Sequence, residues 1–129
     1  MTDLNTLPEV ISKDLFLSLL EELLQNREQH SAEEQAGQLA LLGEKFQKFY
    51  DPDIINGAQR TAIFEILKTA TDTGRLQLME ALIGIMFQYR LDAYALYMEA
   101  LLPTIISATV YQEVYDSILE YKAGSNGHH

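Results

Sequence analysis

Few side chains in this sequence have the type and spacing that catalysis requires. A nucleophilic serine or threonine needs a neighbouring general base, usually a histidine that a third group holds in place. His30 is the only histidine outside the terminal pair His128-His129, and no serine lies in a G-x-S-x-G motif. Cysteine is absent, which excludes thiolate nucleophiles, disulfides and thiolate metal sites. We therefore expect no catalytic triad and interpret His30 as a surface residue beside the acids Glu33 and Glu34.

The sequence also lacks complete motifs for metal-binding and phosphate-binding sites. A di-metal carboxylate bundle needs two Glu-x-x-His motifs, but Arg27 stands three residues before His30. The segment at residues 51–62 only loosely imitates a calcium loop, because Ile55 and Ala62 occupy positions that need acids. No glycine-rich phosphate-binding motif follows a predicted strand. We expect neither a metal nor a cofactor.

Carboxylates one helical turn apart are the remaining candidates for acid–base chemistry. Asp116 lies three residues after Glu113 and four before Glu120. In an acidic protein, neighbouring acids on a helix more often form a solvated face than a catalytic pair. We therefore expect a protein that is not an enzyme.

Tyrosines are concentrated in the C-terminal third of the chain. Tyrosine buries a ring while its hydroxyl stays hydrated, so it suits both the margin of a core and the anchor of an interface. Both interpretations stay open. In the second, acids beside the rings steer a basic partner toward them. The partner interface predicted on this basis consists of Tyr94, Tyr97, Glu99, Tyr111, Glu113, Tyr115 and Asp116.

The apolar residues that must position these side chains recur at helical spacing nearly everywhere, and the chain has only seven glycines and three prolines. This pattern predicts an all-α fold, a single-domain bundle of five to six short helices over residues 1–122. Residues 123–129 are expected to be a disordered tail, in which the paired histidines resemble the remnant of an expression tag. Helix starts are expected at Ser12, at the capping box of Ser31 and Glu34, at Asn56, at Asp92 and near Thr109.

The helix expected at residues 76–89 is apolar around most of its circumference. Its polar positions form one narrow stripe of Gln77, Glu80, Gly84 and Gln88. Charged residues interrupt the surrounding sequence too often for a bilayer span, which needs about twenty uncharged residues. We expect this helix at the centre of the bundle, with a second copy of the chain, in a homodimer, as one source of its covering.

A short internal echo relates residues 79–83 to residues 98–102. Repeat folds need at least about three copies to bury a continuous core, so we interpret the echo as coincidence.

The charge of the chain restricts its partners. The formal net charge is −10, from nine lysines and arginines against nineteen aspartates and glutamates. Residues 1–34 hold eight acids and two bases, residues 35–90 six of each, and residues 91–129 five acids and one base. Acidic ends repel nucleic-acid phosphates and anionic lipids, so we expect no direct binding to nucleic acids or membranes. A protein partner with a basic surface is compatible with this charge.

These observations favour a small cytoplasmic protein–protein interaction module of the adaptor, inhibitor, immunity or chaperone type. The cytoplasmic assignment depends on the acidic N-terminus, which lacks the features of a signal peptide. One alternative is a carrier of a small apolar ligand, with a pocket between helices lined by Met79, Met86, Phe87 and Tyr89. Another alternative is an acidic mimic of nucleic acid that blocks a DNA-binding protein.

Overall fold

The computed structural model describes residues 4–26 and 29–126. In these residues it contains helices and no strand, which confirms the predicted all-α fold. Three short 3-10 turns, η1 (Leu4–Thr6), η2 (Pro52–Ile54) and η3 (Leu102–Thr104), accompany the main helices. The six α-helices are α1 (Lys13–Gln25), α2 (Ala32–Gln47), α3 (Gly57–Ala70), α4 (Leu76–Tyr89), α5 (Asp92–Leu101) and α6 (Ala108–Asn126).

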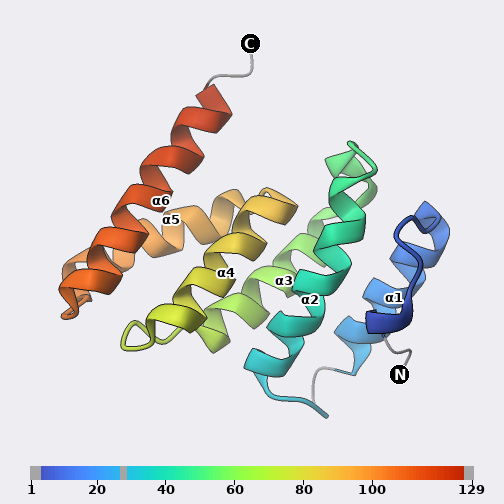
Figure 1. The fold of residues 1–129 in the computed structure, drawn as a ribbon, viewed down its shortest axis with the longest axis horizontal. Coiled ribbons are helices and arrows are strands. Elements are labelled where there is room, and N and C mark those ends of the chain that lie inside the picture. Colours follow the sequence, from blue (N-terminus) through green and yellow to red (C-terminus); the bar gives the residue numbers. More distant parts are fainter. Residues whose placement is uncertain (1–3, 27–28, 127–129) are drawn as a thin grey trace.

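The helices are arranged as neighbouring antiparallel pairs in one domain (Figure 1). Helices α2, α4 and α6 lie side by side and run in one direction, whereas α3 and α5 lie behind them and run the opposite way. Helix α1 packs against α2 and α3 at one end, and α6 packs against α4 and α5 at the other. The internal echo places residues 79–83 on α4 and residues 98–102 at the end of α5, in different layers, so it does not relate equivalent helices.

Local hydrogen bonds explain where three of the helices begin. The Ser12 hydroxyl accepts from the backbone amide three residues later, at the start of α1. Ser31 and Glu34 form the predicted capping box of α2, and Asn56 forms one with Gln59 at α3. Each box pairs two amide groups that the helix itself leaves without acceptors.

The last two helices begin within one residue of the predicted positions, but the predicted caps were wrong. Helix α5 begins at Asp92 without a side-chain cap, and the Asp92 carboxylate instead accepts a hydrogen bond from the Tyr121 hydroxyl of α6. Helix α6 begins one residue earlier than expected, where the Ser107 hydroxyl accepts from the Val110 amide at 3.3 Å. A long-range bond at α5 and a different hydroxyl at α6 thus replace the caps expected from spacing.

The end of α6 also differs from the prediction. The helix was expected to stop near Lys122, before Ala123-Gly124, but it continues through Gly124 to Asn126. A glycine lowers helix propensity without forcing a stop, whereas a proline would. Residues 123–126 are therefore helical and not a disordered tail, and the pair His128-His129 lies outside the described residues.

Helix α4 lies at the centre, as its composition predicted. Its buried residues pack against α2, α5 and α6 of the same chain, and Gln77, Glu80 and Gly84 of the polar stripe are exposed. Gln88, the fourth, is half-buried and donates to the Ala40 carbonyl at 3.2 Å. Since the chain covers α4 itself, the reason for expecting a second copy there is removed. None of the helices in the described part of the chain has the length and apolarity needed to cross a bilayer.

The core contains a stack of aromatic rings between α1, α2 and α4. Tyr89 has no exposed surface, and its ring lies 5.3 Å from that of Phe46, which stacks on Phe16 at 5.4 Å. The Tyr89 hydroxyl donates to the Leu39 carbonyl at 2.6 Å. Burial raises the pKa of Tyr89 well above its ordinary value, because the ring has no water to solvate a phenolate.

Candidate protein-binding surface

The predicted interface residue Tyr94 is a core residue. It has no exposed surface, and its hydroxyl lies 2.8 Å from the Thr71 hydroxyl at the end of α3. Burial raises the pKa of Tyr94 to about 12. Its inclusion in a surface was therefore wrong. The sequence did contain a signal, because Tyr94 shares the helical spacing of Leu91, Ala95 and Met98, all of which are buried.

The predicted residues Tyr97 and Glu99 lie on opposite sides of α5. Tyr97 is half-buried and faces α3, where its ring packs against Phe64 at 5.9 Å and lies under the Lys68 ammonium at 5.8 Å. Glu99 is half-buried and faces α6, where it pairs with Lys122. The two residues therefore cannot form one continuous surface.

The outward side of α6 presents a row of apolar side chains. Tyr111 is 39 % exposed, Tyr115 42 % and Leu119 51 %, at successive spacings of four residues. The two tyrosine rings are nearly parallel, with centroids 6.2 Å apart. Val114 and Ile118, on the neighbouring strip of α6, are buried in the core. Tyr111 and Tyr115 are therefore surface residues, and Leu119 extends their row.

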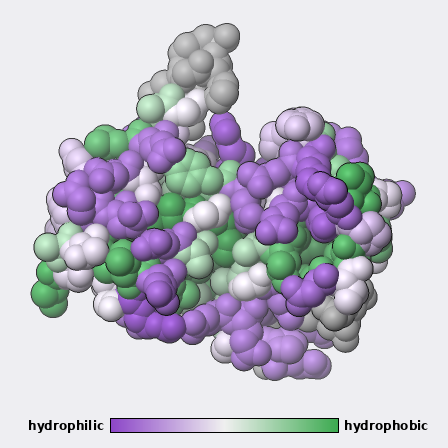
Figure 2. Space-filling model, in the orientation of Figure 1, coloured by the Kyte–Doolittle hydropathy of each residue, from purple (hydrophilic) through white to green (hydrophobic). Residues whose placement is uncertain are grey.

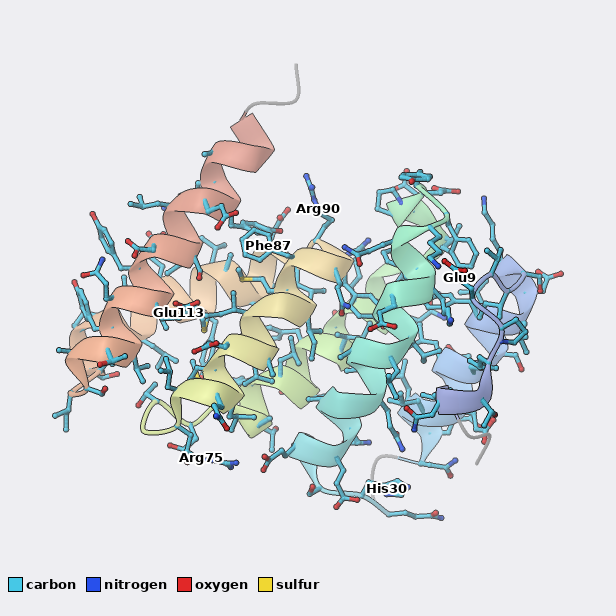
Figure 3. The ribbon with its side chains drawn as sticks, viewed as in Figure 1. Glu9, His30, Arg75, Phe87, Arg90 and Glu113 are labelled. Atoms are coloured by element: carbon cyan, nitrogen blue, oxygen red, sulfur yellow. The ribbon has the colours of Figure 1, made fainter. Side chains whose placement is uncertain are left out.

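Two of the three predicted acids of α6 lie beside this apolar row. Asp116 and Glu120 are exposed, and helical spacing places Asp116 next to Leu119 and Glu120 next to Asp116. Glu113 is half-buried and lies on the other side of α6 from Tyr111 and Tyr115, so its inclusion in the same surface was wrong. Figure 3 shows Glu113 on the side of α6 that faces α4. Within the described residues none of these carboxylates forms an ion pair with lysine or arginine. The outer side of α6 thus combines an apolar row with an unneutralised acidic row.

Leu119 was not among the residues predicted for the interface, although it follows Tyr115 at helical spacing. We use the name α6 surface for the set Tyr111, Tyr115, Asp116, Leu119 and Glu120.

The residues predicted to line a carrier pocket do not form one. Met79, Met86 and Tyr89 have no exposed surface and belong to the closed core. Only Phe87 reaches a surface groove, of about 690 Å³, between the ends of α2 and α4. The groove also contains Arg90, which Figure 3 shows at the end of α4. The core of this protein is filled by its own side chains, which weakens the carrier hypothesis.

Two residues of that groove have an unusual backbone conformation that the sequence did not reveal. Tyr50 (φ 53°) and Arg90 (φ 58°) are the non-glycine residues with positive φ in the described part of the chain. Tyr50 is also 92 % exposed. A left-handed backbone conformation is uncommon for a residue with a bulky side chain. Here Arg90 adopts it directly after α4, and Tyr50 adopts it shortly after α2.

The positions of the acidic residues weaken the hypothesis that this protein mimics nucleic acid. Among the described residues, ion pairs with lysine or arginine are formed by Glu9 with Lys48, Glu33 with Arg75, Asp51 with Lys13 and Glu99 with Lys122. The Lys48 and Arg75 partners lower the pKa of Glu9 and Glu33, respectively. Such pairing interrupts the regular row of free negative charges that a phosphate mimic requires. In the view of Figure 2 the surface is mostly hydrophilic, with hydrophobic residues between the polar ones.

Neither a metal-binding group in the described residues nor a similar protein indicates a function for this chain. In the described ranges, no three His, Asp or Glu side chains come together in a group that could hold a metal ion. No family model, curated protein or solved structure is significantly similar to the sequence or fold.

Proposed function

We propose that this protein is a non-catalytic binding module whose α6 surface binds a basic amphipathic segment of another protein. The observation that carries the proposal is the exposed row of Tyr111, Tyr115 and Leu119 beside the carboxylates of Asp116 and Glu120, which form no ion pair within the described residues. Tyrosine is enriched among the residues that dominate binding energy, because it buries a large ring with little loss of conformational freedom. The apolar row would supply affinity for the partner.

The acidic row determines which partner fits. Asp116 and Glu120 attract lysine and arginine side chains, and this attraction mainly increases the association rate and the specificity. A second copy of the chain would place acid against acid and add to a net charge of −10 per chain. A basic partner is therefore favoured over the homodimer.

The direct test removes the two rings. The double variant Tyr111→Ser/Tyr115→Ser and the control Tyr50→Ser, which removes an exposed tyrosine elsewhere, are used as baits beside the wild type in a lysate of the source organism. One partner should be retained by the wild type and Tyr50→Ser and lost by the double variant. Truncation of an interface tyrosine weakens binding by about 2 kcal/mol, or roughly thirtyfold. Equal recovery by all three baits contradicts the proposal, as does loss of the helical circular dichroism of the double variant.

A second test changes charge without changing size. With the partner identified, Asp116→Asn/Glu120→Gln should lower the association rate at low salt and reduce its dependence on salt. The control Asp14→Asn/Asp53→Asn removes two exposed acids far from α6 in the sequence and should leave both quantities near the wild-type values. Equal effects of the two variants would mean that the net charge of the protein, and not the position of Asp116 and Glu120, determines the association rate.

Sedimentation tests whether a second copy of the chain, and not a basic partner, binds the α6 surface. The wild type should sediment with the monomer mass at micromolar concentrations. A dimer that the Tyr111→Ser/Tyr115→Ser variant abolishes would show that the α6 surface binds another copy, and would overturn the choice of a basic partner.

A further inference from the structure

The surface groove between the ends of α2 and α4 has the dimensions of a small-molecule site. Its volume is about 690 Å³, and none of the residues of the α6 surface lines it. Two of its aromatic rings are accessible, because Tyr50 is 92 % exposed and Phe87 is half-buried. Figure 3 shows Phe87 in the last turn of α4 and Arg90 just beyond the end of this helix. The groove therefore offers aromatic surface close to a guanidinium group.

Arg90 gives this groove a cation without a partner. Within the described residues, its guanidinium makes no hydrogen bond, ion pair or ring contact. Every other lysine or arginine in residues 4–26 and 29–126 has such a contact, in a chain with nineteen aspartates and glutamates. A guanidinium presents its N–H donors in a planar fork that matches a carboxylate. Arg90 is therefore the group of the groove that is best suited to hold a carboxylate.

The backbone places Tyr50 and Arg90 at the groove at a cost in stability. Their φ angles of 53° and 58° are left-handed, and glycine would adopt them with less strain. Neither side chain makes a hydrogen bond within the described residues that would offset this cost. Residues held in such conformations are concentrated at ligand sites. A contact of both side chains with a ligand explains why bulky residues occupy these two positions.

The other charges of the groove limit the charge of the ligand. Lys48 forms an ion pair with Glu9. Asp51 forms one with Lys13. Glu44 is exposed, forms no ion pair within the described residues and repels a second negative group. The net charge of −10 likewise repels an acidic segment of another protein, so a small ligand with a single carboxylate fits best.

We infer that this groove binds a small aromatic monocarboxylate. The carboxylate accepts hydrogen bonds from the Arg90 guanidinium, and the aromatic ring of the ligand lies against Tyr50 and Phe87. This site is a groove on the surface, whereas the carrier alternative placed its pocket inside the core. The inference is independent of the α6 surface and of the function proposed for it.

The inference is tested by nuclear magnetic resonance titration of the full chain. The probe is 3-phenylpropanoate, and the controls are 3-phenylpropanamide, which lacks the charge, and propanoate, which lacks the ring. The probe should shift the Arg90 Nε–H and Tyr50 ring resonances and bind at least about fivefold more tightly than either control. No shift, or equal affinity for the probe and its amide, overturns the inference.

A further titration distinguishes a free acid from the C-terminus of a protein chain. Acetyl-Ala-Phe with a free carboxylate carries the same ring and the same charge on a peptide backbone. It should bind no more tightly than 3-phenylpropanoate. Binding at least about tenfold tighter than that of the probe would show that the groove recognises a chain terminus, and would overturn the choice of a small ligand.

Variants separate recognition of the carboxylate from a general effect on the fold. Arg90→Gly should weaken binding of 3-phenylpropanoate about tenfold or more and leave binding of 3-phenylpropanamide unchanged. Tyr50→Ser should weaken both about threefold, because both ligands carry the ring. The control Lys68→Ala makes the same change in net charge on α3 and should affect neither. An equal loss with Lys68→Ala and Arg90→Gly would mean that only the net charge acts, and would overturn the inference.

The stability of Arg90→Gly provides a readout without ligand. The substitution relieves the left-handed φ at this position and should raise the melting temperature by about 3 °C. A lower melting temperature would mean that the guanidinium already has a stabilising partner inside the protein. That result overturns the inference, because Arg90 would not be free to hold a ligand.

Discussion

Replacement of Tyr94 by phenylalanine tests the burial that removed this residue from the predicted interface. The Tyr94 and Thr71 hydroxyls lie 2.8 Å apart, and Thr71 also donates to the Leu67 carbonyl at 2.7 Å. Thr71 therefore keeps a partner in the variant. At neutral pH, Tyr94→Phe should lower the free energy of unfolding by about 1 kcal/mol, the net value of one hydrogen bond.

The same substitution should have a smaller effect in alkaline solution. Burial raises the pKa of Tyr94 from 10.0 to about 12. Above pH 10 the unfolded chain loses this proton while the folded chain keeps it, so the wild type loses stability as the pH rises. At about 1.36 kcal/mol per pKa unit the loss reaches about 2.7 kcal/mol once the pH exceeds 12, and about 0.8 kcal/mol already accrues between pH 9 and 10.5.

Urea unfolding followed by circular dichroism, at about pH 7, 9 and 10.5, measures this difference. The gap between the wild type and Tyr94→Phe should stay near 1 kcal/mol up to about pH 9 and nearly close by about pH 10.5. Other tyrosines titrate in both proteins, so the difference isolates Tyr94. A gap that is constant over this range would show that Tyr94 titrates as an exposed phenol, and the assignment of this ring to the core would be refuted.

Substitutions at three other positions have expected effects on the urea midpoint. The Arg60 guanidinium donates to the Tyr89 carbonyl at 2.6 Å and the Pro52 carbonyl at 2.7 Å, so Arg60→Met should lower the unfolding free energy by about 2–3 kcal/mol. Arg60→Lys should recover less than half of this loss, because an ammonium cannot reproduce the planar fork, and full recovery would contradict the role of the fork. Arg90→Gly should raise the unfolding free energy by about 0.5–1 kcal/mol, because φ is 58° at this helix end, and a decrease would show that the side chain has a stabilising contact. Ser31→Ala should lower it by about 1 kcal/mol while Ser31→Asp does not, since either oxygen can cap α2, and equal losses would argue against capping.

Features that depend on neighbouring residues in the sequence were predictable. The spacing of apolar residues identified the helices, and the capping boxes at Ser31 and Asn56 marked two starts, because both signals act within one or two turns. The central position of α4 followed from its composition, since a helix with so narrow a polar stripe must be covered on most sides.

Features that depend on which helices meet were not predictable. The contact of the Tyr97 ring with Phe64 and the ion pair of Glu99 with Lys122 depend on α3 and α6 lying on different sides of α5. The Asp92 carboxylate was expected to cap a helix but accepts from Tyr121, 29 residues away.

Because each helix packs mainly against its neighbours, the helices at the two ends of the array should be the first to unfold locally. Helices α2 and α4 have other helices on both sides, whereas α1 and α6 each end the array. When units contact only adjacent units, fraying begins at the ends, so backbone amides there exchange with deuterium sooner than those at the centre. The apolar row of α6 thus lies on one of the two helices that should detach most readily, and a partner that binds the α6 surface should slow amide exchange in α6 more than anywhere else in the molecule.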